Sequence, residues 1–216
     1  MRPRWDSEPV ARWLAFVASG VLGARALIDA LRLRGELSYS ELFERSFRDP
    51  RRLGRALTEV ERELLRLERV ADGLLLMAAL TLACWLFLRY RALDERRRNP
   101  SWALGSWLVP GLNLIEPYRI VREVHAGGPS AAGERAPWPI FVWWSSWLLY
   151  LVLLIATIAA EGRAVGYLNA GEPLPAFEQS LLAVRLGIGA TLASAIAASL
   201  AAVVVLDTER RLSARG

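Results

Sequence analysis

The stretch GLLLMAALTLACWLFL, Gly73 to Leu88, decides the fold class of this chain. It carries no charged side chain, and an arginine-rich segment follows it directly. A helix that crosses a bilayer needs about 20 mostly apolar residues. If the helix begins one turn before Gly73, the stretch reaches that length. We therefore predict a membrane-spanning helix here.

Three further stretches have the same character, namely Val10–Leu31, Trp138–Ala160 and Ser180–Leu206. More than half of the 216 residues, 54%, are hydrophobic, and they are concentrated in these runs. A soluble domain would spread its apolar residues along the chain instead. We predict an all-α fold: an integral membrane four-helix bundle with an extramembrane helical hairpin and a Pro-broken re-entrant or interfacial helix.

The arginines predict which way the spans face. Every Lys or Arg position in this chain is an arginine, and with the N-terminus inside, the inner segments hold 14 arginines against 11 outside. The densest group follows the Gly73–Leu88 stretch: Arg89, Arg91, Arg96, Arg97 and Arg98. Basic residues next to a span favour the cytoplasmic side and attract anionic lipid. We expect a bacterial inner-membrane protein with both termini cytoplasmic, in which this group either binds anionic lipid or only sets the topology.

Four regions follow from this topology. Residues 1–34 form a cytoplasmic N-terminus and the first span, and residues 35–72 form an extracytoplasmic amphipathic hairpin. Residues 73–206 contain the other three spans, with a cytoplasmic interrupted segment at 102–124, and residues 207–216 form a cytoplasmic tail.

The hairpin region carries two helix-start signals. Ser38 followed by Glu41 is a capping-box pattern, and Asp49-Pro50 supplies an N-cap and a first-turn proline. After Pro50, apolar residues recur at heptad spacing: Leu53, Leu57, Val60, Leu64, Leu67 and Ala71. Such a seam packs against another helix. We expect the partner to be the chain's own preceding helix, with dimerisation as the alternative.

Small residues at helical spacing predict close packing inside the bilayer. The first span has Ala15, Ser19 and Gly23 in one row. The last span has Gly189, Ala193, Ala197 and Ala201 in one row, with Ala190, Ser194, Ala198 and Ala202 beside it.

Four charged residues lie within or at the outer ends of the spans: Arg25, Asp29, Glu161 and Arg185. Charges at membrane depth are rare and usually paired or functional. We predict an outer ion-pair cluster with Asp29–Arg185 as its main pair. The alternative is that Arg25 and Arg185 extend to the interface and pair with nothing in the bilayer.

The segment SWLVPGLNLIEPYRIVREV, Ser106 to Val124, begins as an apolar helix and is broken by Pro110 and again by Pro117. Proline ends or kinks a helix, and Gly111 permits backbone angles that other residues avoid. We expect a half-helix, a turn and an interfacial helix, beneath tryptophans that form either an interfacial belt or a deeper vestibule. The candidate residues for binding or structure are Trp107, Pro110, Asn113, Glu116, Pro117, Tyr118, Arg119, Trp143, Trp144 and Trp147.

This segment resembles a known family. The run WLVPGLNLIEPYRIVRE, Trp107 to Glu123, is similar to the signature of number 4328 in the series of bacterial domains of unknown function. WLFLRYRAL (85–93), PSWA (100–103) and the Trp143-Trp144 pair resemble other parts of the family, over about residues 74–205. The position of Glu116 is more often basic in that family. The resemblance implies an integral membrane protein and no particular activity.

The remaining residues argue against most enzymes. His125 and Cys84 are the only residues of their kinds, so they cannot form a Cys/His metal site, and we expect no catalytic residue, metal or cofactor. His125 is expected to be a solvated surface residue. We predict an interaction, scaffold or sensory protein with a protein partner or a second copy and no nucleic acid. The alternative is a transporter or channel subunit that uses residues 106–119.

Overall fold

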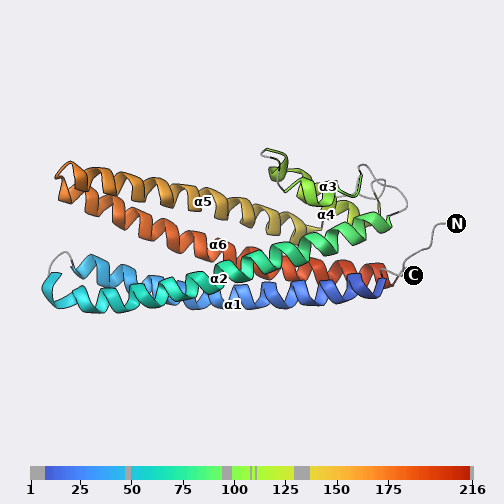
Figure 1. Ribbon diagram of the computed structural model, residues 1–216, viewed down its shortest axis with the longest axis horizontal. Helices are drawn as coiled ribbons and strands as arrows, with labels where there is room; N and C mark the ends of the chain where they lie inside the picture. Colours follow the sequence, from blue (N-terminus) through green and yellow to red (C-terminus); the bar gives the residue numbers. More distant parts are fainter. Residues whose placement is uncertain are drawn as a thin grey trace. The chain divides into compact units, whose positions relative to one another are not determined.

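The computed structural model describes residues 8–46, 50–93, 99–107, 109, 111–128 and 137–214. Its elements in chain order are α1 (Glu8–Ser46), α2 (Pro50–Ala92), α3 (Trp102–Gly105), the 3-10 turn η1 (Leu112–Leu114), α4 (Glu116–Ala126), α5 (Trp138–Asn169) and α6 (Pro173–Ser213) (Figure 1). The described residues contain no strand. The predicted all-α fold is confirmed.

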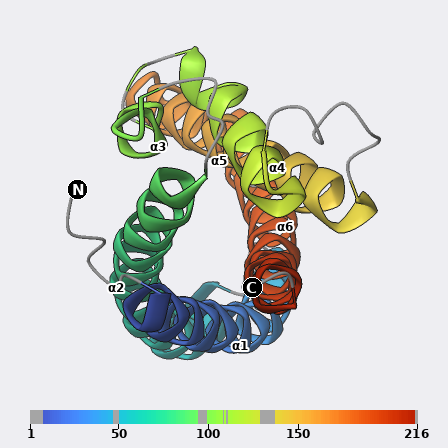
Figure 2. The ribbon, with the colours of Figure 1, turned by 90° about the vertical axis from the view of Figure 1, so that its right-hand side faces the viewer.

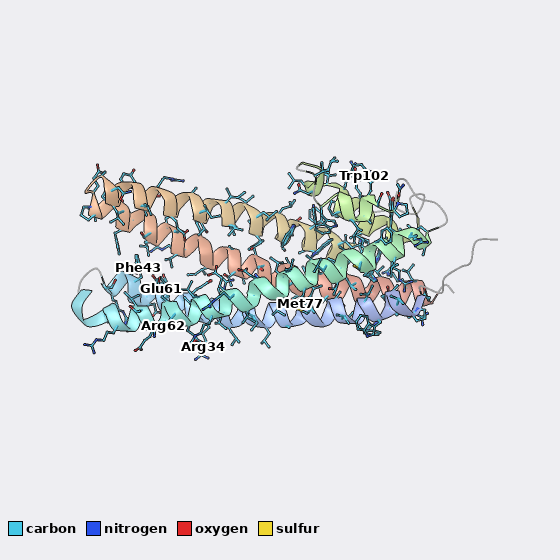
Figure 3. All side chains as sticks on the ribbon, viewed as in Figure 1. Arg34, Phe43, Glu61, Arg62, Met77 and Trp102 are labelled. Atoms are coloured by element: carbon cyan, nitrogen blue, oxygen red, sulfur yellow. The ribbon has the colours of Figure 1, made fainter. Side chains whose placement is uncertain are left out.

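Four of these helices, α1, α2, α5 and α6, are long and apolar enough to cross a membrane. Large apolar side chains on these helices are exposed, for example Met77 on α2, which Figure 3 labels. The α1 helix has 39 residues, which is about 58 Å of helix against about 30 Å of hydrocarbon. The chain is therefore a four-span membrane protein whose helices are longer than the bilayer requires.

The predicted helix start at Ser38 is wrong, because α1 continues without interruption to Ser46. The Ser38 hydroxyl donates to the carbonyl of Arg34 at 3.2 Å, as serine does inside a helix. No proline lies between Leu31 and Ser38, and Gly35 alone costs a helix only about 1 kcal/mol. The second predicted start is confirmed at Pro50, where α2 begins, while Asp49 lies outside the described residues.

The chain divides into two compact units. Unit 1 takes its described residues from 1–24, 74–145 and 197–216, and unit 2 from 25–73 and 146–196. Each of the four long helices contributes a segment to each unit. The short helices α3 and α4 belong to unit 1, where α4 lies beside the first turns of α5 (Figure 1 and Figure 2).

The core of unit 1 is built from α2, α4, α6 and the first turns of α5, against the start of α1. Its largest buried side chains are Trp85, Tyr90, Leu86, Ile120, Ile140 and Val121. On α1, Ala11, Ala15, Ala18 and Leu22 are buried, while Gly23 is exposed and a Cβ there would touch nothing within 4 Å. Ser19 is half-buried, so the predicted row on the first span is wrong only at Gly23, where the buried face has moved to Leu22 by alternating steps of four and three.

In unit 2 the heptad seam of α2 packs on α1. A Cβ on Gly35 would lie 2.9 Å from Leu64 Cδ2, so the two helices are close at this point. All six seam residues are buried or half-buried, which confirms that the seam packs within the chain. On α6, a Cβ on Gly189 would lie 3.3 Å from Leu153 Cδ1 of α5. The small residue at Gly189 thus permits the close approach predicted for the last span.

Candidate functional site

The interrupted segment is a short helix, a 3-10 turn and a second helix. Trp102 opens α3, which ends after one turn at Gly105 (Figure 3). Gly111 then adopts φ 81° and ψ −45°, in the region that favours glycine. Pro110, one of the predicted site residues, lies outside the described residues. The backbone amide of Asn113 donates to the carbonyl of Val109 at 3.0 Å and closes the turn.

Tryptophans from α5 hold this turn in place. The indole N–H of Trp144 donates to the carbonyl of Leu114 at 3.0 Å. The rings of Trp107 and Trp144 meet edge to face with centroids 6.1 Å apart, and those of Trp143 and Trp144 are 5.4 Å apart. Three of the predicted tryptophans therefore gather in unit 1. Trp147 belongs to unit 2 and packs against Tyr150 instead, with centroids 5.4 Å apart.

The second helix, α4, begins at Glu116 with Pro117 in its first turn, where the missing amide of proline costs nothing. Glu116 is only 5% exposed, and Arg119 donates to its Oε1 at 3.2 Å. Arg122 lies over the ring of Tyr118, 5.6 Å from its centroid. Glu116, Tyr118 and Arg119 of the predicted motif thus contact side chains about one turn away on α4.

Two spans hold α4 through side-chain hydrogen bonds. The Tyr90 hydroxyl on α2 donates to Glu123 Oε2 at 2.9 Å. On α6, Thr208 donates its hydroxyl proton to the carbonyl of Val204 at 2.7 Å. Its oxygen must therefore accept the Nδ1–H of His125, which lies 2.9 Å away.

The expectation of a solvated His125 is wrong, since this residue is only 4% exposed. Its partner Thr208 is 83 positions away in the sequence, so no local pattern connects the two residues. The α4 helix ends at Ala126, where Gly127 caps it with φ 81°, and the amide of Gly128 donates to the carbonyl of Glu123 at 2.9 Å.

A buried ionic cluster lies at the end of α2, and the sequence reasoning missed it. Arg89 Nε and the Trp85 indole N–H both donate to Glu209 Oε1, at 2.6 and 2.5 Å, and Arg89 Nη2 donates to Glu209 Oε2. Arg89 Nη1 donates to Glu8 Oε2 at 2.5 Å. The sequence did contain a signal for this cluster. Glu8 and Glu209 each place a carboxylate on a terminal segment, and both segments were predicted to lie on the same side of the membrane as Arg89.

One member of the predicted lipid-binding group lies in this cluster. Arg89 is 5% exposed, and its guanidinium is occupied by the carboxylates of Glu8 and Glu209. Arg91 is exposed, while Arg96, Arg97 and Arg98 lie outside the described residues.

A second buried cluster lies in unit 2. Arg25 Nε donates to Asp29 Oδ2 at 2.9 Å, and the Ser194 hydroxyl donates to the same oxygen at 2.7 Å. Arg25 also donates to the carbonyl of Ala71 and, at 3.2 Å, to Ser194 Oγ. Arg25 is 2% exposed and Asp29 0%. One ion pair thus joins α1, α2 and α6.

The predicted pair Asp29–Arg185 does not form. Arg185 instead donates to Glu44 Oε1 at 3.0 Å in an exposed pair. Ser194, which does reach Asp29, follows Arg185 by nine residues, or about 14 Å along α6. Glu161 is exposed and pairs with no cation among the described residues. Of the four predicted residues, the structure brings together Arg25 and Asp29 only.

Comparison with known proteins identifies a family. Residues 60–210, which include most of α2 and all elements from α3 to α5, match the model of a family described as a domain of unknown function (DUF4328). No curated protein and no solved structure matches the chain.

Proposed function

The chain belongs to the family of the domain of unknown function DUF4328, and from this premise we propose that it is a membrane-embedded interaction component, a scaffold or sensory subunit of the bacterial inner membrane. Four spans with both termini in the cytoplasm fit this role. The observation that carries the proposal is the closure of the interrupted segment by contacts within its own chain.

A transporter uses a broken helix differently. In such proteins the interrupted backbone and its polar side chains line a water-filled site at membrane depth. Here the carbonyl of Leu114 accepts a hydrogen bond from the Trp144 indole. The carboxylates of Glu116 and Glu123 accept hydrogen bonds from Arg119 and Tyr90, respectively. Groups with partners of this kind are poorly placed to coordinate a passing ion, and they favour a structural role for the segment.

The exposed surface of the interrupted segment favours contact with a membrane or with another protein. Leu104, Val109, Leu114 and Ile115 are between 39% and 51% exposed although they lie outside the four spans. Next to them on α4, the side chain of Arg119 is 48% exposed. An apolar patch with a basic rim is typical of a surface that meets a membrane or another protein. We propose that the apolar part lies in the bilayer interface and that the α4 part meets the partner.

Site-directed photocrosslinking in native membranes tests this function. A photoreactive side chain at Arg119 should give a discrete protein adduct, because α4 would face the partner. The matched control is the same substitution at Arg163, an exposed arginine of α5. Adducts with lipid alone at Arg119, or the same protein adducts at both positions, would contradict the proposal.

One observation favours a transporter or channel subunit as the second candidate, namely the buried Arg25–Asp29 pair within a span. Flux of small ions through proteoliposomes that contain the protein separates the two functions. We expect no flux above that of empty vesicles. A flux that Asn113→Ala or Asp29→Asn abolishes would establish transport instead.

A further inference from the structure

Unit 1 contains a surface hollow of about 430 Å³ where α5 begins and the apolar run of α6 ends. Six of its lining residues are apolar: Pro137, Pro139, Ile140, Val203, Val204 and Leu206. The other three, His125, Asp207 and Arg210, are polar. Binding sites for small molecules have this size and this mixture of an apolar wall with a few polar groups.

The position of the hollow along the spans indicates the kind of ligand. Trp138 opens α5, and Leu206 is the last residue of the apolar run on α6, so the apolar wall lies where both spans leave the hydrocarbon. Asp207 and Arg210 follow on the polar side. A molecule that fills the hollow must therefore be apolar at one end and polar at the other, as a membrane lipid is.

Both charges in the hollow have bonding capacity left. Arg210 is exposed and forms no ion pair with any residue that the structure describes. Asp207 Oδ2 accepts Arg211 Nε at 3.0 Å and lies 3.8 Å from His125 Nε2, while Asp207 Oδ1 has no hydrogen bond within the described chain. The hollow thus offers one guanidinium for an anion and one carboxylate oxygen for a donor.

From these features we propose that the hollow binds an aminophospholipid, a lipid whose headgroup carries a phosphate and a primary ammonium. The phosphate pairs with Arg210, because guanidinium groups match phosphate oxygens. The ammonium donates to Asp207, and one acyl chain lies along Pro139 and Val203, two residues of the apolar wall that are not buried. A choline headgroup has the same two charges but no N–H, so it cannot make the bond to Asp207.

The proposal is tested by native mass spectrometry of the full-length protein in detergent. The probes are phosphatidylethanolamine, phosphatidylcholine and phosphatidylglycerol with identical acyl chains, and soluble phosphoethanolamine. We expect phosphatidylethanolamine to bind about tenfold more tightly than phosphatidylcholine, the effect of one charge-assisted hydrogen bond. Phosphoethanolamine should bind far more weakly than the lipid, because it leaves the apolar wall empty.

Substitutions locate the preference in the hollow. Asp207→Asn removes the negative charge that faces the headgroup cation, so it should weaken phosphatidylethanolamine more than phosphatidylcholine and remove most of the tenfold preference. Asp207→Glu should retain the preference, and Arg210→Gln should weaken both lipids. The control is Arg185→Gln, an exposed arginine elsewhere on α6, which should change neither.

Three results would overturn the proposal. The first is equal affinity for the ethanolamine and choline lipids, and the second is a preference that survives Asp207→Asn. The third is tighter binding of phosphatidylglycerol than of phosphatidylethanolamine, which would identify a site for anionic lipid. None of these results bears on the partner proposed for α4, because the photocrosslink at Arg119 is measured separately.

Discussion

The two carboxylates that bind Arg89 should contribute very differently to stability. Glu209 is 11% exposed at its side chain, whereas Glu8 is 43% exposed, and the Arg89 side chain between them is 4% exposed. Removal of one partner from a buried ion pair costs about 3–5 kcal/mol, because the other charge is left in a low dielectric. Exposed pairs contribute only about 0–1 kcal/mol.

Glu209→Gln keeps the shape of the side chain but replaces an acceptor with an amide donor that faces Arg89. Since Glu8 still compensates part of the charge, we expect a loss near the lower limit, about 3 kcal/mol. Glu8→Gln should lower the free energy of unfolding by less than about 1 kcal/mol. The isosteric control is Glu161→Gln, an exposed residue of α5 without an ion pair among the described residues, which should have no effect.

The measurement is the free energy of unfolding in mixed micelles, from titration with a denaturing detergent followed by tryptophan fluorescence. Equal losses for Glu209→Gln and Glu8→Gln would refute the reasoning, because burial would then not decide the strength of these contacts. A loss below about 1 kcal/mol for Glu209→Gln would do the same.

The same assay and hydrogen exchange check three further predictions. Trp144→Phe keeps an aromatic side chain but removes the N–H that binds the carbonyl of Leu114 and part of the buried volume. It should therefore cost more than about 1 kcal/mol and speed amide exchange in η1, and unchanged exchange would contradict it. Asp29→Asn leaves Arg25 as a buried uncompensated charge and should cost about 3 kcal/mol, whereas Arg185→Gln should cost less than about 0.5 kcal/mol. Similar costs would contradict the conclusion that burial decides the strength of the two pairs. Gly111→Ala should cost about 1–2 kcal/mol because φ is 81° there, and an increase in stability would show that the turn relaxes.

The sequence was sufficient for the parts of the fold that local patterns determine. Four apolar runs predicted four spans, and Pro50 marked the start of α2. The heptad seam of α2 was recognised because its period is written within one segment. The Ser38 pattern failed for the same local reason, since a capping box stabilises a helix start only where the preceding helix has already ended.

The candidate site was less predictable, because its contacts join distant segments. The pair Arg25–Asp29 is visible at a spacing of four, but its third member, Ser194, depends on how far α6 is shifted along α1. That shift also decides that Arg185 meets Glu44 instead of Asp29. Periodicity gives the face of a helix that is buried but not its offset from a neighbour.

The two bonds that hold α4 make this helix a point of thermodynamic coupling. Tyr90 connects it to α2 through Glu123, and His125 connects it to α6 through Thr208. A molecule that binds α4 more tightly in one arrangement of these bonds favours that arrangement of the spans. The shift in the equilibrium equals the ratio of the molecule's affinities for the two arrangements. The relation is reciprocal, and α4 contributes His125 to the lining of the hollow between α5 and α6. If the proposed lipid also favours one arrangement of these bonds, its binding changes the affinity of α4 for the proposed partner. A change in membrane lipid could in this way be transmitted to a protein contact without any movement of an ion.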